Sequence, residues 1–362
     1  MHVISLRTTM VAVTLAAALT ACSNQTSQTS DTAGGSAAPA GKMLTIVGAG
    51  SSFDLPFFSR AFSQYGASHP GVRVDYQSIG SGGGIRQFTA RTVDFGASDV
   101  PMGAKELAAI PNDRKVMQLP VTLGGVAIAY NVPDAPPHLR LNPQVLTDIF
   151  LGKITNWSDP QIAALNPGFT PRNLPIAVVH RADGSGTTYI FSDYMSKVSP
   201  QWKDRVGVGK TVPWIAASAQ GYKGTEGVAG AIRNNPGAIG YVELSYAMQS
   251  AIPYAMLQNK AGRYVLPSLE TVGAAAAAKP NVNAKDFSIV DQGAANAYPI
   301  AGYSWVLLYQ TYADAAKQAA LHDLFVWMET DGQKLASQIE YVPLPDAASK
   351  AALASLQTLG RK

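Results

Sequence analysis

The sequence has 362 residues, of which 47% are hydrophobic, so the chain is long enough to form two ordinary domains with real cores. It carries 28 Lys and Arg residues and 24 Asp and Glu residues, which gives a formal net charge of +4. This composition excludes a disordered chain, and the dispersed basic residues argue against binding of nucleic acid, which usually requires a concentrated basic surface.

The first residues have the pattern of a secretion signal, and we expect residues 1–21 to be a signal peptide. Arg7 supplies the positive charge, and the apolar stretch from Met10 to Leu19 is too short to cross a bilayer. Cys22 is the only cysteine of the chain, and "LTAC" resembles the bacterial lipobox, in which the thiol after the cleavage site is lipidated. The alternative is an ordinary cleaved signal with an incidental Cys22, although a lone exported cysteine cannot form an internal disulfide.

Residues 22–42 are predicted to be a lipidated cysteine followed by a flexible tether. The stretch from Ser23 to Lys42 is rich in Ser, Thr, Gly and Ala and has no large apolar residue that could offset the entropy of ordering. We therefore expect an exported protein that a lipid anchors to a membrane of the cell envelope, at its periplasmic or external face.

The body begins with strands that alternate with helices. The run "MLTIVGAG" predicts a buried strand, and apolar residues at helical spacing from Phe57 to Tyr65 predict a helix closed by Gly66 and Pro70. "VRVDYQSIG" alternates like a strand, "IRQFTARTV" resumes as a helix, and "DFGASDVPM" is typical of a short strand and turn. This alternation indicates an α/β protein with a largely parallel sheet.

Two long apolar runs of strand character divide the rest of the chain. They are "LPVTLGGVAIAYNVP" from Leu119 and "AYPIAGYSWVLLYQ" from Ala297. Two such crossings predict two lobes joined by two hinge strands, with the last segment returning to the first lobe. We expect lobe 1 to comprise residues 43–119 and 299–362, and lobe 2 to comprise residues 120–298.

Three turns combine glycine with hydroxyl residues, and each follows a predicted strand and precedes a predicted helix. They are "GAGSSF" (48–53), "GSGGG" (80–84) and "DGSGTT" (183–188). Such turns direct backbone N–H groups and hydroxyls at one spot, where the helix dipole favours an anion. Any one of them is explained by turn formation alone, but the three together, with Arg181 beside the last, favour a binding site. Walker A and dinucleotide-binding patterns fail, because Asp204 and Phe53 stand where those motifs require glycine.

The body resembles the PstS family, the extracytoplasmic phosphate-binding proteins of the ATP-driven phosphate importer. The resemblance covers residues 44 to about 345 and is carried by "GAGSSF", "GSGGG", "VDFGASD", "FLGKITNW", "LPIAVVHRADGSGTT" and "PGAIGYVE". It implies a two-lobed periplasmic binding-protein fold of type II that closes on inorganic phosphate, with the transmembrane subunits of an ABC permease as partners. It also implies a monomer with no cofactor, no metal and no enzymatic activity.

The resemblance also implies which residues bind phosphate. Asp183, two places after Arg181, is expected to pair with Arg181 and orient it. Many relatives have Ala where Ser51 stands and Thr where Ser52 stands, and Asp54 to Pro56 departs from their Pro-rich continuation. The implied contacts are Ser51, Ser52, Phe53 (through its main-chain N–H), Ser81, Asp99, Arg181, Ser185, Gly186 and Thr187.

Asp99 is the residue expected to select phosphate over sulfate. Phosphate near neutral pH keeps at least one proton and sulfate keeps none, so an acceptor-only carboxylate pairs with phosphate and repels sulfate. The alternative is that Asp99 is a turn residue that caps a helix. Arg181 has the charge and planar fork suited to phosphate oxygens, and a surface ion pair is the alternative for Arg181 with Asp183.

Three other functions remain open from the sequence. The site could take another tetrahedral oxyanion such as sulfate, molybdate or arsenate, or serve sensing or adhesion rather than uptake. A secreted serine hydrolase is the rival of another class, because Ser185 lies near His180 and Asp183. However, "DGSGT" is not the G-x-S-x-G elbow, and the five histidines are too scattered to suggest a metal site.

Overall fold

The computed structural model describes residues 43–111, 114–170 and 173–361. The predicted signal peptide, Cys22 and the predicted tether lie outside these residues. Within the described part of the chain, no helix has both the length and the apolar content needed to span a membrane.

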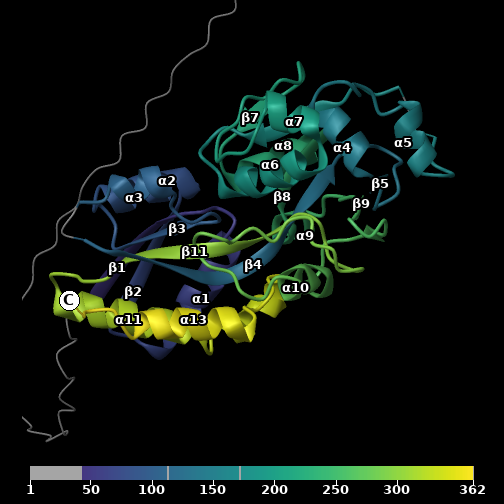
Figure 1. Cartoon of the computed structure of the whole chain (residues 1–362). Coiled ribbons are helices and arrows are strands. Elements are labelled where there is room, and N and C mark those ends of the chain that lie inside the picture. Colours follow the sequence, from purple (N-terminus) through teal and green to yellow (C-terminus); the bar gives the residue numbers. More distant parts are fainter. Residues whose placement is uncertain (1–42, 112–113, 171–172, 362) are drawn as a thin grey trace, which may run out of the picture. The chain divides into compact units, whose positions relative to one another are not determined.

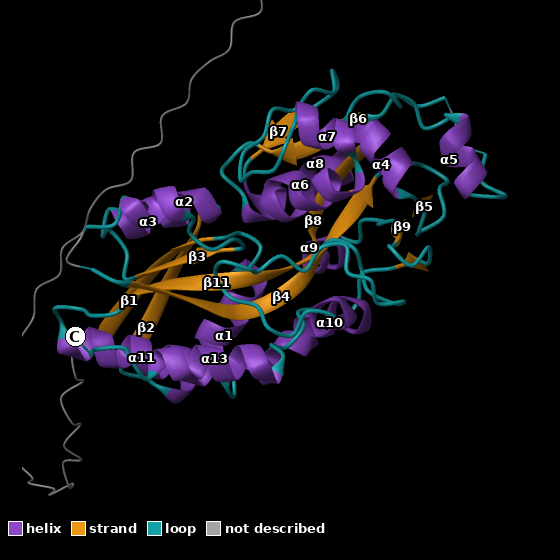
Figure 2. Ribbon diagram, viewed as in Figure 1, coloured by secondary structure: helices purple, strands orange, loops and turns teal. Residues whose placement is uncertain are grey.

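One mixed sheet runs through the whole body, in the strand order β2-β1-β3-β11-β4-β8-β6-β7. Figure 2 shows β4 and β11 as long strands that connect the two ends of this sheet. The strands are β1 (Leu44–Gly50), β2 (Val72–Ser78), β3 (Phe95–Ser98), β4 (Val116–Tyr130), β6 (Ala177–Arg181), β7 (Gln220–Tyr222), β8 (Ala238–Glu243) and β11 (Ala301–Tyr309).

The prediction of a largely parallel sheet is only partly right. β1 is parallel to β2 and β3, and β6 is parallel to β7 and β8. β11 is antiparallel to β3 and β4, and β4 is antiparallel to β8, because the chain crosses in one direction along β4 and returns along β11. The two long crossings predicted from the sequence are therefore confirmed, and they pair with each other in the middle of the sheet.

Helices cover both faces of the sheet where β1, β2 and β3 lie, and we call this part of the body the first half. Figure 1 shows α2 and α3 on one side of these strands and α1, α11 and α13 on the other. The last segment therefore packs against the first strands. The helices are α1 (Leu55–Ser68), α2 (Ser81–Thr89), α3 (Ala104–Ala108), α11 (Ala315–Glu329), α12 (Gln333–Ala336) and α13 (Asp346–Leu356), with the 3-10 turn η1 (Ser337–Ile339).

The second half is built around β6, β7 and β8, with α6, α8 and α9 against them. A small separate sheet has the order β10-β9-β5. The remaining elements are β5 (Arg140–Leu141), α4 (Pro143–Phe150), α5 (Pro160–Leu165), α6 (Gly186–Val198), α7 (Pro200–Arg205), α8 (Gly224–Asn234), α9 (Leu244–Gln249), β9 (Met256–Gln258), β10 (Tyr264–Val265) and α10 (Leu269–Ala277).

The first two helices show how the sequence positions the turns that precede them. The predicted apolar face of α1, from Phe57 to Tyr65, is buried as expected. The helix predicted from Ile85 is present, but α2 begins earlier, at Ser81, so the glycines form its first turn, and it ends at Thr89. A Cβ on Gly84 would lie 2.4 Å from the Cα of Gly50, so only glycine lets α2 approach the end of β1 this closely.

Candidate functional site

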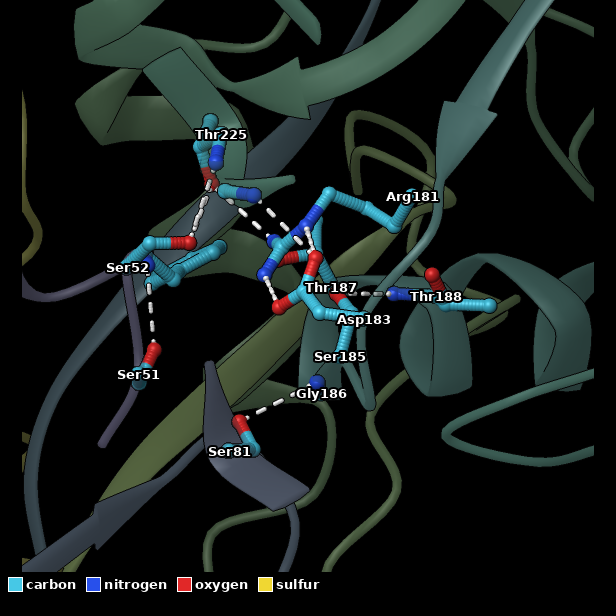
Figure 3. A network of polar contacts seen from close by, with 12 residues as sticks. Ser51, Ser52, Ser81, Arg181, Asp183, Ser185, Gly186, Thr187, Thr188 and Thr225 are labelled. Carbon is cyan, nitrogen blue, oxygen red and sulfur yellow. Dashed lines mark hydrogen bonds and ion pairs between the residues drawn. The ribbon is translucent and has the colours of Figure 1, made fainter. Parts of the chain in front are cut away.

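Four helices begin at one place between the two halves of the body. They are α1 and α2 of the first half and α6 and α8 of the second half. Helix N-termini present unpaired N–H groups and the positive end of the helix dipole. The predicted turn at 48–53 precedes α1, and those at 80–84 and 183–188 run into the first turns of α2 and α6. The structure brings the three together as expected, and Figure 3 shows their polar side chains facing one another.

The turn after β1 supplies two buried hydroxyls and one main-chain donor. Ser51 Oγ donates to Asp99 Oδ1 and accepts from the N–H of Phe53 at 3.0 Å. Ser52 Oγ lies 2.9 Å from Thr225 Oγ1, across the boundary between the halves. The backbone carbonyl of Ser52 also accepts from the hydroxyl of Tyr246 at 2.7 Å, so the second half contacts this turn through both its side chain and its backbone.

Asp99 is the buried carboxylate of the site, and its two oxygens have different surroundings. Oδ1 accepts from Ser51 and from Ser304 Oγ at 2.9 Å, whereas Oδ2 has only long contacts, to Ser81 Oγ at 3.4 Å and Thr187 Oγ1 at 3.5 Å. Burial raises the pKa of Asp99, although the bonds from Ser51 and Ser304 and the charge of Arg181 oppose that rise. The helix-cap alternative is wrong, since the next helix, α3, follows Gly103.

Arg181 ends β6 and forms a bidentate ion pair with Asp183. Its Nε donates to Asp183 Oδ1 at 2.7 Å, its Nη2 donates to Oδ2, and its Nη1 donates to Thr225 Oγ1 at 3.2 Å. The alternative of a surface ion pair is wrong, because the Arg181 side chain is only 2% exposed. Burial alone would raise the pKa of Asp183, but its bonds and attraction to Arg181 lower that pKa overall, so both groups are charged and the guanidinium is fixed in one orientation.

The turn before α6 meets the first half directly. The N–H of Gly186 donates to Ser81 Oγ at 3.1 Å, and the N–H of Gly82 donates to the carbonyl of Gly184 at 2.8 Å. Ser185 Oγ caps α6 by accepting from the N–H of Thr188 at 3.1 Å. A Cβ on Gly186 would lie 2.6 Å from Asp99, so a glycine is required where the two halves touch.

Three residues of this network were not singled out from the sequence. Thr225, at the start of α8, joins Ser52 to Arg181, and its N–H also donates to Ser52 Oγ at 3.1 Å. Its turn, "YKGTEG", has the same glycine and hydroxyl composition as the three predicted turns, so a signal was present. Asp54 and Ser304 lie behind Asp99 in a buried chain of contacts, and no local pattern distinguishes them.

The side chains of the hydrolase alternative do not form a catalytic relay. His180 stacks on Trp214 with ring centroids 4.4 Å apart, and its Nδ1 lies 2.9 Å from the carbonyl oxygen of Arg181. Asp183 pairs with Arg181, and Ser185 caps a helix. Burial lowers the pKa of His180, which favours a neutral ring packed in the fold. Among residues 43–111, 114–170 and 173–361, no group of His, Cys, Asp and Glu could hold a metal ion.

Comparison with known proteins agrees with this architecture. The model of the PBP superfamily domain matches residues 24–320. A phosphate-binding protein PstS of Xylella fastidiosa is 42% identical, with 93% of each chain covered, and one of Pasteurella multocida is 43% identical, with 83% of this chain and 87% of the relative covered. The crystal structure of a phosphate-binding protein from Stenotrophomonas maltophilia superposes with a TM-score of 0.67 at 19% identity, covering 86% of this chain and 93% of that one. The chain therefore belongs to the PstS family of phosphate-binding proteins.

Proposed function

We propose that the protein binds inorganic phosphate between the two halves of its body and delivers it to an ATP-driven permease. The observation that carries the proposal is the buried carboxylate of Asp99, which lies among hydroxyl and N–H donors while Arg181 is held beside it. Such a site supplies donors for the oxygens of a tetrahedral anion and one acceptor for a proton on that anion.

The proposed ligands are those expected from the sequence, with Thr225 added. Phosphate would lie among these groups and take over donors that now contact one another, such as the N–H of Gly186, which donates to Ser81. Asp183 would hold Arg181 in one orientation, so that the positive charge of its guanidinium faces the phosphate. The ligands are Ser51, Ser52, Phe53, Ser81, Asp99, Arg181, Ser185, Gly186, Thr187 and Thr225.

We further propose that the halves are lobes that close on the ligand. The boundaries expected from the sequence, near residues 119–120 and 298–299, lie in β4 and just before β11, which are the strands that connect the halves. Because Ser52 and Ser81 belong to one half and Thr225 and Gly186 to the other, a bound anion that contacts both halves favours the closed state. The permease would then recognise the closed shape.

The cellular setting is proposed from the N-terminal sequence. Lipidation at Cys22 and a tether to residue 42 would hold the protein at a membrane of the cell envelope as a monomeric binding protein rather than an enzyme. Deleting the gene should lower phosphate uptake at low external phosphate, and unchanged uptake would contradict the transport role.

Titration calorimetry with phosphate and sulfate tests the proposed ligand. The wild type should bind phosphate more tightly, and Asp99→Asn should reduce the phosphate-to-sulfate affinity ratio by about tenfold or more, because an amide can donate to sulfate. Asp94→Asn is the matched control, since Asp94 lies at the other end of β3 and pairs with Lys317. Tighter binding of sulfate than of phosphate by the wild type would overturn the proposal.

A further inference from the structure

A second buried carboxyl group lies directly behind Asp99. Asp54 precedes α1 and is fully buried, with Oδ2 2.5 Å from Ser304 Oγ. Its Oδ1 is buried without a hydrogen-bond partner among the described residues. The same Ser304 Oγ lies 2.9 Å from Asp99 Oδ1, so one hydroxyl connects the two acids.

The charge of this group of side chains, Asp54, Ser304 and Asp99, depends on how many protons the two acids carry. Both contacts of Ser304 have hydrogen-bond length, yet its hydroxyl has one proton and can donate to only one carboxyl oxygen. The other contact must use a proton carried by an acid. Two ionised carboxylates would instead leave lone pairs facing each other in a site that water does not reach, which is strongly unfavourable.

The surroundings identify Asp54 as the acid that keeps the proton. Asp99 Oδ1 also accepts from Ser51, and the positive charge of Arg181 favours the ionised form of Asp99. Among the residues that the structure describes, the Asp54 carboxyl group has only Ser304 as a hydrogen-bond partner. Burial raises the pKa of Asp54 well above its usual range, and the charge of Asp99 raises it further.

We propose that Asp54 is a specificity-determining positioning residue, whose proton is donated to Ser304 so that Ser304 donates to Asp99 and keeps it an acceptor. This inference rests on the proposed function. Oδ1 of Asp99 is then saturated by Ser51 and Ser304, and Oδ2 is left for the proton of the ligand.

Transfer of the Asp54 proton through Ser304 to Asp99 would reverse this arrangement. Asp54 would then be ionised, Ser304 would turn its proton to Asp54, and Asp99 would carry the acid proton instead. A protonated Asp99 donates to any tetrahedral oxyanion. Discrimination between phosphate and sulfate would be lost.

The other titratable groups facing Asp54 are mostly neutral at pH 7. Burial raises the pKa of Glu243 to about 8, and burial likewise raises the pKa of each neighbouring tyrosine, so the tyrosines remain neutral phenols. Asp99 is therefore the main charge that Asp54 experiences at pH 7, and Glu243 adds a smaller one as it ionises at higher pH. The groups facing Asp54 are Asp99 after β3, Glu243 in β8, Tyr76 in β2, Tyr246 in α9 and Tyr341 before α13.

The experiment combines aspartate-selective 13C NMR with calorimetry. In the phosphate-bound wild type, an Asp carboxyl carbon should have the shift of a protonated acid at neutral pH; Asp54→Asn should remove this signal and Asp94→Asn should keep it. The phosphate affinity of the wild type should fall as this signal is lost on raising the pH, because the deprotonated pair adds a negative charge beside the anion. The affinity of Asp54→Asn should lack this fall, because its amide carries no charge and donates to Ser304 at every pH.

The proposal is overturned if the wild type shows no protonated Asp, if its phosphate affinity does not change as that signal is lost, or if Asp54→Asn shows the same fall as the wild type. Should Asp54→Asn not fold, the NMR titration and phosphate affinity of the wild type decide by themselves. Failure of the proposed function is a separate result, in which the wild type does not bind phosphate at any pH.

Discussion

Replacing Thr225 with valine tests the closed arrangement most directly. Valine keeps the shape of threonine but removes the hydroxyl that contacts Ser52 Oγ at 2.9 Å and accepts from Arg181 Nη1 at 3.2 Å. The N–H of residue 225 can still donate to Ser52, so the link between the halves is weakened rather than abolished.

The expected loss of phosphate affinity in Thr225→Val depends on which of the two hydrogen bonds of Thr225 exists only when the halves are together. The contact between Ser52 and Thr225 joins the two halves and exists only when they are together. Arg181 and Thr225 belong to the same half, and in the proposed open state water would reach an unpaired Arg181 N–H. An unsatisfied buried donor costs about 1–3 kcal/mol, which corresponds to phosphate binding weakened by about 5- to 150-fold.

Calorimetric titration with phosphate measures this change, and Thr225→Ser is the matched control. Serine keeps the hydroxyl, so its affinity should stay within about threefold of the wild type, since a lost methyl group affects the open and closed states alike. Wild-type affinity in Thr225→Val would refute the reasoning. An equal loss in Thr225→Ser would show that the hydroxyl is not the cause.

Three further substitutions test other parts of the site. Lys210→Gln removes the ion pair that Lys210 Nζ forms with Glu106 across the halves at 2.7 Å. Calorimetric titrations at low and high salt should show phosphate binding weakened by up to about fivefold at low salt and unchanged at high salt. Gly186→Ala forces a Cβ against Asp99 and should weaken binding by about 5- to 150-fold in the same titration. Glu243→Gln should remove a loss of stability between about pH 4.5 and about pH 8, measured by urea unfolding.

The sign of the last prediction follows from proton binding. Because the folded-state pKa of Glu243 lies above that of an exposed glutamate, the folded protein binds more protons than the unfolded chain in this window, and its stability falls as pH rises by at most about 1.4 kcal/mol per pH unit. Glutamine cannot titrate, so wild type and variant should agree near pH 4.5 and diverge toward about pH 8. A constant difference between them would contradict the assignment.

Matched controls exist for the other two substitutions. Lys317→Gln breaks an ion pair with Asp94 inside the first half and should leave phosphate binding unchanged. Gly273→Ala places a Cβ in α10 that meets only Val342, at 3.8 Å, and should be tolerated. If either control weakens binding as much as its partner variant, the effect does not arise at the boundary between the halves.

The parts of the site that the sequence predicts are those decided by local chemistry. Turns of glycine and hydroxyl residues between a strand and a helix indicate where hydrogen-bond donors gather, so the positions of Ser51, Ser81 and Ser185 are predictable. Their assignment as phosphate contacts comes from the resemblance to PstS proteins. The face of α1 was predictable for the same reason, since its helical spacing is local. The directions of the strands were not predictable, because the residues within a strand do not determine which neighbouring strand it pairs with.

Ser304 shows why the remainder of the site could not be predicted. It lies in a strand whose residues are all buried, where one serine is consistent with ordinary packing, and it contacts acids that precede it by 250 and 205 residues. Only the pairing of β11 with β3 brings these groups together.

One trace of this arrangement is nevertheless present in the sequence, at Pro120. Proline has no N–H to donate, so in a central strand it is expected at a bulge. In the structure the register between β11 and β4 shifts between Ser304, which faces Thr122, and Trp305, which faces Pro120. Bulges redirect the side chains beside them, and this one lies at the serine that contacts both Asp54 and Asp99. Pro120 therefore lies at the bulge that positions Ser304, and the Ser304 hydroxyl contacts both acids.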